Sequence, residues 1–250
     1  MVKKALLFGF NYSGSGCALS GCWNDAKNMK AFLLTKGYSE ENITLVTDDP
    51  SPSTDPGLAS ARCTTKDQMM HYFLDFIENV KSGDHLFIHY SGHGGQLPDH
   101  NKDEKDGMDE CIYSPDLQSI SDDDLRKVLV DSLPGDVTLV TLFDCCHSGT
   151  ILDLPYTKSR NGYTVENTKS VKNNVFCISA CLDTQTAADT SFDRMPQGAL
   201  THGFLEAVKM VEGKGTWVGL MDHIIQSTRY FPQRAQLSYS KNLADFDKMF

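Results

Sequence analysis

Short apolar runs alternate along the chain with segments of helical periodicity. The runs are rich in β-branched and aromatic residues, which is typical of buried strands. They predict strands over Ala5–Phe10, Ile43–Thr47, His85–Ser91, Val137–Phe143 and Val175–Ser179, and a late strand over Ala235–Tyr239. Because strands that alternate with helices favour parallel pairing, we expect an α/β fold with a central, mostly parallel β-sheet flanked by helices on both faces.

Polar residues that favour capping positions mark the predicted helix starts. Asn24 is expected to cap one helix, and Thr65 with Gln68 forms a capping box at the start of another. Further helices are expected to begin at Ser121, Thr201 and Thr216. Apolar positions spaced as on one helix face follow these residues, which favours helices packed against the sheet.

Two polar stretches predict irregular structure. Asp48–Cys63 is rich in Pro, Ser and Asp, and Tyr156–Asn174 lacks apolar periodicity and is expected to be an exposed linker. The linker, residues 156–174, divides the chain into a large region, residues 1–155, and a small region, residues 175–250. Both regions are expected to add strands to one sheet, so we expect one domain.

Charge and cysteine content narrow the classes of partner. A formal net charge of −10 argues against nucleic acid, which needs a basic face, and is compatible with basic substrates or bound cations. No apolar run reaches about 18 residues, so no membrane partner is expected, and the apolar start ends at Asn11, too early for a signal peptide. The eight cysteines form no C-x-x-C pair, and we expect reduced thiols in a cytoplasmic protein.

Chemistry-bearing residues follow two of the predicted strands. The strand ending at Tyr90 leads into Ser91–Gly95, and the strand ending at Phe143 leads into Asp144–Gly149. In open α/β sheets, ligands bind beyond the carboxyl ends of the strands. A third loop, Ser13–Gly16, lacks the last glycine of a dinucleotide-binding loop, and we expect a flexible loop at the rim of the cleft.

A histidine and a cysteine therefore come after two strands that are expected to be neighbours. His93 can take the proton of a thiol, which makes the sulfur a nucleophile. The backbone N–H groups of Gly94 and Cys146 are the candidates for binding an oxyanion. His147 is expected to point away, because adjacent residues of an extended chain face opposite sides. These arguments leave Cys145 and Cys146 as alternative nucleophiles.

The two segments that carry His93 and Cys146 resemble the histidine box and the cysteine box of the metacaspases, the caspase-like peptidases of protists, fungi, plants and algae. The resemblance rests on Tyr90–Gly94 and Asp144–Gly149, and it extends in the family's order over nearly the whole chain through Gly21–Ala26, Ile178–Gln185 and Gly198–Thr201. It implies a caspase-like fold in which the large and small regions correspond to the p20 and p10 parts. It also implies that the nucleophile is the cysteine directly before the box histidine, Cys146.

The resemblance further implies cleavage after Arg or Lys. The matching acids of the specificity pocket are Asp25 and Asp144, with Cys22 and Ser91 beside them. Carboxylates hold a guanidinium well, which agrees with this role. The alternative is that Asp25 supports a helix N-terminus and that Asp144 orients a nearby loop.

Calcium is the cofactor that the resemblance implies, because many metacaspases require it. The residues that match the family's calcium site are Asp109, Asp122, Asp123 and Asp153. Oxygen-rich clusters are what calcium binds. The alternative is that these acids are simply solvated in loops, or that they lie in the first turn of a helix because the helix dipole stabilises negative charge there.

The resulting hypothesis is a calcium-activated cysteine endopeptidase with a His93–Cys146 dyad, acting as a monomer on protein or peptide substrates. The alternative is a non-catalytic caspase-like scaffold or a protein that binds basic peptides. Compared with many metacaspases, we expect that an N-terminal prodomain is absent or trimmed and that the linker is short. The linker contains Lys158, Arg160, Lys169 and Lys172, so self-cleavage is an open possibility.

Overall fold

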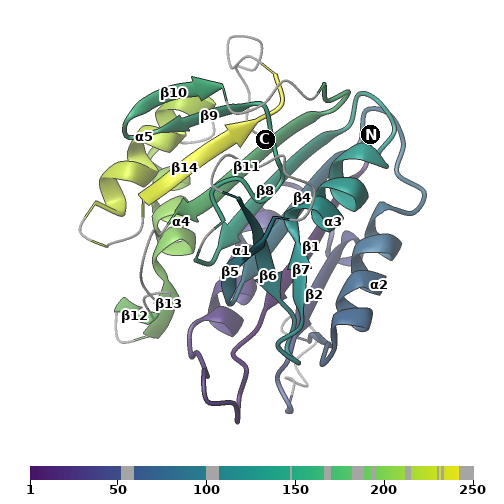
Figure 1. Ribbon diagram of the computed structural model, residues 1–250, viewed down its shortest axis with the longest axis vertical. Helices are drawn as coiled ribbons and strands as arrows, with labels where there is room; N and C mark the ends of the chain where they lie inside the picture. Colours follow the sequence, from purple (N-terminus) through teal and green to yellow (C-terminus); the bar gives the residue numbers. More distant parts are fainter. Residues whose placement is uncertain are drawn as a thin grey trace.

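The computed structural model describes residues 1–51, 59–99, 107–146, 148–165, 170–181, 189–192, 195–211, 215–229, 231 and 234–241. In this part of the chain, the main sheet has nine strands in the order β10-β9-β14-β11-β8-β4-β1-β2-β3 (Figure 1). The strands that pair in parallel are β1 (Lys3–Gly9), β2 (Ile43–Thr47), β3 (Ala61–Arg62), β4 (His85–Ser91), β8 (Thr138–Asp144) and β11 (Asn174–Cys181). The strands that pair antiparallel at one edge are β14 (Arg234–Tyr239), β9 (Tyr156–Ser159) and β10 (Gly162–Val165).

Helices cover both faces of the main sheet, as the sequence predicts. Within β1, Leu6 and Phe8 face one core while Ala5 and Leu7 face the other, because strand side chains alternate. The first face is covered by α2 (Lys66–Ile77) and α3 (Asp122–Arg126), which continues into a π-helical turn, Lys127–Asp131. The second face is covered by α1 (Cys22–Thr35), α4 (Ala199–Val211) and α5 (Trp217–Ser227). A short 3-10 turn, Glu40–Asn42, precedes β2, and no described helix has the length and apolar character that crossing a membrane requires.

Two smaller sheets lie beside the main one in the described residues (Figure 1). The strands β5 (Gly94–Pro98), β6 (Met108–Tyr113) and β7 (Ser119–Ser121) pair antiparallel, and Ile112 and Ile120 join the core on the α2 face. A hairpin of β12 (Asp189–Phe192) and β13 (Met195–Gly198) leads directly into α4. The sequence did not predict these strands.

The predicted strands are confirmed to within two residues at each end, and three of the predicted caps are confirmed. The side chains of Thr65, Ser121 and Thr216 accept backbone hydrogen bonds at the starts of α2, α3 and α5. The cap at Asn24 is wrong, because α1 begins earlier, at Cys22, whose N–H donates to the distant Asn11 side chain (3.0 Å).

Two other predicted helix signals are also wrong in detail. Thr201 lies inside the first turn of α4, which begins at Ala199. The Gln68 side chain accepts from the N–H of Thr64 (2.8 Å), one residue before the position that a capping box uses.

The prediction of an irregular linker is wrong for its first half, and the prediction of exposure is wrong for residues 156–159. Residues 156–165 form the hairpin β9–β10, which pairs with β14. Tyr156 stacks on Tyr239 with ring centroids 5.4 Å apart, and the buried Lys158 ammonium pairs with Asp222 at 2.6 Å. The pattern of apolar residues missed this strand because it buries hydroxyl groups, a ring face and a lysine stem rather than aliphatic side chains.

The buried face of β1 is expected to contribute strongly to stability. We predict that Leu7→Ala lowers the free energy of unfolding by about 2–5 kcal/mol, because Leu7 is fully buried and leaves a cavity. The matched control is Leu74→Ala on α2, where the side chain is 50% exposed and the expected change is within about 0.5 kcal/mol. Urea unfolding of both variants measures the difference, and equal losses would contradict the described packing.

Candidate active site

The two sequence boxes lie at the same edge of the main sheet. The strands β4 and β8 pair in parallel, with Tyr90 opposite Phe143 and Ser91 opposite Asp144. The pairing extends one step further, since the Gly92 N–H donates to the Asp144 carbonyl (3.4 Å). Neighbouring strands lie about 4.8 Å apart, so the segments that carry the histidine and the cysteine begin side by side.

His93 and Cys146 each follow these paired residues by two positions. The Cys146 side chain is 7% exposed, whereas Cys145 is fully buried in the core on the α2 face. Burial raises the pKa of Cys145 well above its ordinary value, and the neighbouring Cys146 adds to that effect. Cys145 is therefore held as a neutral thiol, and Cys146 is the one of the two neighbouring cysteines that keeps some exposure to solvent. The neighbouring His147 lies outside the described residues.

The His93 imidazole is oriented by a backbone carbonyl. Its Nε2 lies 2.6 Å from the carbonyl oxygen of Cys17. A carbonyl can only accept, so Nε2 carries the hydrogen and Nδ1 is the basic nitrogen. The imidazole also lies against the ring of Tyr12, with centroids 4.6 Å apart.

The glycine after the histidine is required by a close approach of two backbones. A Cβ atom at Gly94 would overlap the carbonyl oxygen of Cys146 and would lie 3.0 Å from the Cys145 sulfur. The start of β5 is thus pressed against the cysteine turn. The two residues predicted to bind an oxyanion, Gly94 and Cys146, are neighbours in space.

The predicted specificity acids, Asp25 and Asp144, converge on Gly198. The Gly198 N–H lies 3.0 Å from both carboxylate oxygens of Asp25, which also accepts from the Ser91 hydroxyl at 2.7 Å. Asp144 accepts from the Thr201 N–H at 2.8 Å, in the first turn of α4. A Cβ atom at Gly198 would overlap Asp144 Oδ2 and would lie 2.8 Å from Asp25 Oδ2.

These acids are buried beside the strand ends. Burial raises the pKa of Asp144, although hydrogen bonds from Thr201 and Leu200 oppose that effect. Asp25, Ser91 and Cys22 are also buried, and Cys22 lies one turn before Asp25 on α1. The structure therefore brings the four predicted pocket residues together. Asp25 lies in the first turn of α1, but its carboxylate binds the end of β13 and Ser91, and Asp144 binds the first turn of α4, so these contacts differ from those that the alternative predicted.

A second acidic cluster forms at the start of α3. Carboxylate oxygens of Asp109, Asp122 and Asp123 lie within 4.8 Å of one another. Asp122 accepts from the N–H groups of Glu110 and Asp123, both at 2.7 Å. Burial, together with the negative charges of Asp153 and Glu110, nevertheless raises the pKa of Asp122 to about 8.

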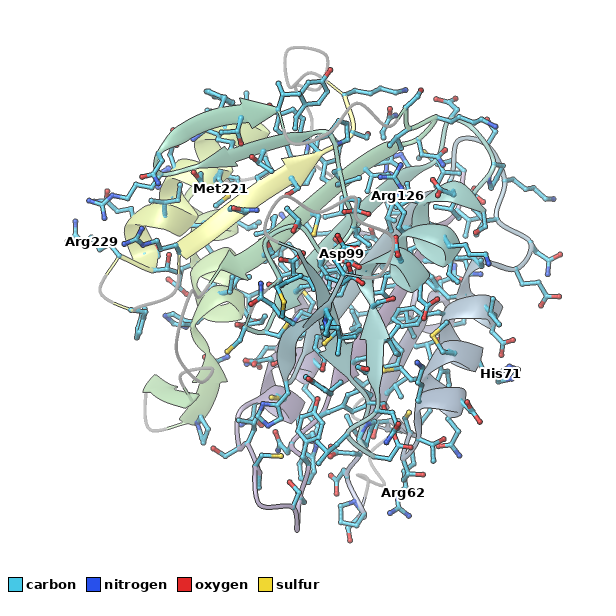
Figure 2. All side chains as sticks on the ribbon, in the orientation of Figure 1. Arg62, His71, Asp99, Arg126, Met221 and Arg229 are labelled. Atoms are coloured by element: carbon cyan, nitrogen blue, oxygen red, sulfur yellow. The ribbon has the colours of Figure 1, made fainter. Side chains whose placement is uncertain are left out.

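The donor set of this cluster fits calcium. Its ligands are hard carboxylate oxygens, which calcium prefers, and two hydrogen bonds do not offset the repulsion among the acids. Arg126 projects from α3 (Figure 2) and donates to the backbone carbonyl of Asp153. This hydrogen bond ties residues 148–155, the loop that follows Cys146 and is called the cysteine loop here, to the acidic cluster. Glu110, which the resemblance does not include in the calcium site, is a further neighbour, and Thr150 donates to it.

Several residues around His93 were missed by sequence reasoning. Two of them, Tyr12 and Cys17 with its carbonyl, follow the end of β1. Asp48 follows the end of β2, and Tyr90 lies within β4. The rule that ligands bind beyond the carboxyl ends of parallel strands, applied to β1 as well, would have indicated Tyr12.

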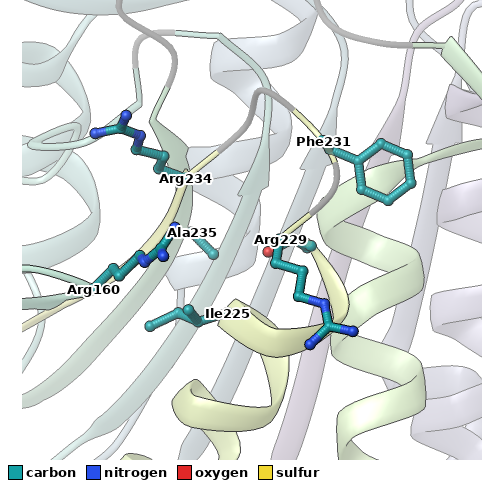
Figure 3. Close-up of a pocket in the computed structure, with 7 residues that line it drawn as sticks. Arg160, Ile225, Arg229, Phe231, Arg234 and Ala235 are labelled. Carbon is teal, nitrogen blue, oxygen red and sulfur yellow. The ribbon is translucent and has the colours of Figure 1, made fainter.

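Two cavities lie away from the strand ends. A groove of about 670 Å³ runs between α1 and α4 and is lined by Phe32, Leu205 and Gln197 among others, so it reaches the residue before Gly198. A pocket of about 200 Å³ beside β14 is lined by the three arginines 160, 229 and 234. Figure 3 shows the Arg229 side chain extending away from the other two, so the guanidinium groups do not converge on one anion site.

Solved structures share this architecture. A crystal structure of a protein from Geobacter sulfurreducens has a TM-score of 0.71 and 23% identity, and the match covers 100% of this chain and 97% of that one. Caspase-1 from Spodoptera frugiperda has a TM-score of 0.62 and 12% identity, covering 96% of this chain and 86% of the caspase. The chain thus has a caspase-like fold, as the sequence analysis predicts.

Sequence relatives define the family. Residues 3–155 match the metacaspase peptidase C14 domain. Metacaspase-1 from Kluyveromyces lactis is 46% identical over 168 residues, which cover 66% of this chain and 37% of that protein. Metacaspase-1 from Cryptococcus neoformans var. neoformans is 33% identical over 293 residues, which cover 95% of this chain and 62% of that protein. The chain spans less than two thirds of the length of either relative. It belongs to the metacaspases, a family of cysteine-type endopeptidases.

The raised pKa of Asp122 makes a prediction for the metal-free protein. Between an unfolded pKa near 3.9 and a folded pKa of about 8, the folded state holds an extra proton, so stability falls as the pH rises through this range. We predict that Tm in the presence of a chelator falls between about pH 5 and pH 8, and that Asp122→Asn reduces this fall. Asp124→Asn, on the exposed side of α3, is the control and should behave as the wild type. An unchanged pH dependence in Asp122→Asn contradicts the assignment.

Proposed function

We propose that this chain is a calcium-activated cysteine endopeptidase that cleaves protein or peptide substrates after Arg or Lys. The observation that carries the proposal is the parallel register of β4 and β8, which brings the segments of His93 and Cys146 to one edge of the sheet. The orientation of His93 by the Cys17 carbonyl supports a role as base, since it leaves Nδ1 free of a hydrogen.

In the proposed reaction, His93 accepts the thiol proton and the Cys146 sulfur bonds to the scissile carbonyl carbon. The carbonyl oxygen becomes an oxyanion, for which the N–H groups of Gly94 and Cys146 are the proposed donors. The C–N bond then breaks, His93 returns the proton to the leaving amine, and a thioester remains. Water, deprotonated by His93, attacks the thioester, releases the acid and restores the thiol.

Specificity for a basic residue is proposed to come from the pair of buried acids. Asp25 and Asp144 approach the same glycine, so two negative charges share a small volume that excludes water. A guanidinium or an ammonium between them would offset their repulsion and would add charge-assisted hydrogen bonds. Substrates with a neutral or acidic side chain gain neither effect.

The proposed calcium site consists of Asp109, Asp122 and Asp123, with Asp153 contributing from the cysteine loop. Calcium would compensate the buried negative charge of these acids, since the pKa of Asp122 is raised chiefly by burial and also by the charge of Asp153. Asp153 lies in the left-handed backbone region (φ 48°) on the segment that begins at Cys146. Holding this residue would therefore fix the loop that carries the nucleophile.

We also propose a monomeric protein of the cytoplasm. In the described residues the outer strand at the β14 edge is β10, whose four residues offer little length for pairing with a second copy. The seven cysteines whose side chains are described form no disulfide, which agrees with a reducing compartment.

Self-cleavage within residues 156–174 is proposed to avoid Lys158. This side chain is buried against Asp222 in the paired strand β9, so its peptide bond is not accessible to a cleft. Arg160, which lies in the turn between β9 and β10, is exposed, and so is Lys172, so both are accessible alternatives, while Lys169 lies outside the described residues.

A fluorogenic peptide assay tests the dyad. With calcium present, we expect cleavage after Arg and Lys, and a loss of about 1,000-fold or more in kcat for Cys146→Ala and for His93→Ala. The matched control is Cys145→Ala, which removes the neighbouring buried thiol and is expected to retain most of the activity. Full activity of Cys146→Ala would overturn the nucleophile assignment.

The same assay tests specificity. Asp144→Asn is expected to lower kcat/KM for the Arg peptide by at least about 10-fold, because one charge partner is lost. A peptide with Asp at the cleaved position is the control substrate, and equal cleavage after Asp and Arg contradicts the basic-residue pocket. Binding of an Arg peptide without any turnover would instead favour a non-catalytic basic-peptide binder.

Titration calorimetry and activity together test the calcium site. We expect Asp122→Asn to weaken calcium binding by about 10-fold or more and to abolish calcium stimulation, because it removes a buried ligand charge. The control is Asp124→Asn, two residues further along α3. It removes one negative charge, as Asp122→Asn does, but Asp124 lies outside the cluster, so calcium binding and stimulation should persist. Equal stimulation of Asp122→Asn and wild type would refute the site.

A further inference from the structure

The residue at the end of β1 that contacts His93 has a strained backbone. Tyr12 lies in the left-handed region (φ 50°), which few residues other than glycine adopt. Asp48 holds this conformation, since its carboxylate accepts from the N–H groups of Asn11 (2.9 Å) and Tyr12 (2.6 Å). Strain that is held in place by specific contacts is typical of functional sites.

The side chain of Tyr12 places its hydroxyl group against the backbone of His93. The His93 N–H donates to the Tyr12 hydroxyl oxygen (3.0 Å), and that hydroxyl donates to the Tyr113 carbonyl (2.8 Å). A second phenol, Tyr90, donates to the His93 carbonyl at 2.6 Å, and the two phenol oxygens lie 2.9 Å apart. Both polar groups of the His93 peptide are thus held by tyrosine hydroxyls.

Both phenols are completely buried and stay protonated. Burial raises the pKa of Tyr12 and of Tyr90 well above the ordinary value. Each hydroxyl therefore supplies one donor hydrogen, and the carbonyls of His93 and Tyr113 are acceptors within reach of the two phenols.

Tyr12 also begins the loop that orients the imidazole. The Ser15 N–H donates to the Tyr12 carbonyl (3.0 Å), and the Leu19 N–H closes the loop on the Asn11 carbonyl (2.7 Å). Between these bonds lies Cys17, whose carbonyl oxygen is 2.6 Å from His93 Nε2. The loop predicted to be flexible is therefore tied at both ends, and one residue controls the ring face, the backbone and the Nε2 partner of His93.

We propose that Tyr12, assisted by Tyr90 and Asp48, is a positioning residue that fixes the orientation and tautomer of His93. This proposal rests on the proposed His93–Cys146 dyad. Without the Tyr12 hydroxyl, the His93 N–H loses its acceptor and the imidazole loses its fixed approach to the thiol. Catalysis is sensitive to such displacement, because about 1 Å of misplacement can cost about 100-fold in rate.

The test compares Tyr12→Phe with Tyr38→Phe. Tyr12→Phe keeps the ring and removes only the hydroxyl, and we expect kcat to fall about 10-fold while KM changes less than about 2-fold. Tyr38 is also a buried tyrosine, but it packs on the opposite face of the sheet, and its Phe variant should match the wild type. If Tyr12→Phe only unfolded part of the protein, the fraction of active enzyme would fall, but the pH dependence of the folded enzyme would not change.

The decisive readout is the rate at which iodoacetamide alkylates Cys146 as a function of pH, followed by mass spectrometry. A positioned imidazole keeps the sulfur reactive below the ordinary thiol pKa of about 8.5. We expect Tyr12→Phe to slow alkylation at pH 6.5 about 3- to 10-fold and to move the midpoint toward 8.5. The exposed Cys17 in the same sample reports reagent activity.

The outcomes separate this proposal from the proposed function. If His93→Ala shifts the Cys146 profile and Tyr12→Phe leaves both profile and kcat unchanged, the dyad stands and the positioning role is refuted. If His93→Ala leaves the profile unchanged, the dyad itself fails, and the positioning role fails with it. If Tyr12→Phe does not fold, Tyr90→Phe and Asp48→Asn decide by the same profile.

Discussion

The parallel pairing of β4 with β8 is the constraint on which the candidate site depends. In a parallel pair both carboxyl ends lie at one edge, so the turns after Ser91 and Asp144 start together. β1 pairs with the other side of β4 and ends at the same edge, with Gly9 opposite Ser91. Three turns are thereby packed into one place, and Gly94 has no room for a Cβ atom because the cysteine turn lies against it.

The two acidic groups near this edge are balanced in different ways. Asp25 and Asp144 lie among backbone N–H donors at the end of β13 and the start of α4, which compensate part of their charge. At the start of α3, two backbone N–H groups donate to Asp122, yet burial and the charges of neighbouring acids still raise its pKa to about 8. Asp25 and Asp144 are thus held in place before any ligand binds. A bound cation would stabilise the acids at the start of α3 more, because the charge of Asp122 stays unfavourable despite its two hydrogen bonds.

The sequence predicted the central strands well because burial on both faces of a parallel sheet produces continuous apolar runs. β2 and β4 match their predicted ranges, and the two boxes lie where a strand-end argument puts them. The hairpin β9–β10 was missed because it is recognised by its pairing with β14, a long-range contact that no local pattern encodes. Asn24 failed as a cap for a similar reason, since the residue that caps α1 is the distant Asn11. The convergence of Asp25 and Asp144 on Gly198 likewise joins three separate segments.

The loop after β1 shows why composition misjudges rigidity. Ser13–Gly16 is rich in glycine, yet the loop is closed by backbone hydrogen bonds on Asn11 and Tyr12. Its carbonyl at Cys17 orients His93 without a third titratable side chain. A carboxylate in that place would gain and lose charge with pH, whereas a carbonyl accepts a hydrogen at every pH and always selects the Nε2–H form of the neutral ring. The orientation of the His93 imidazole is therefore as constant as the loop that carries the carbonyl, and the strained backbone of Tyr12 starts that loop.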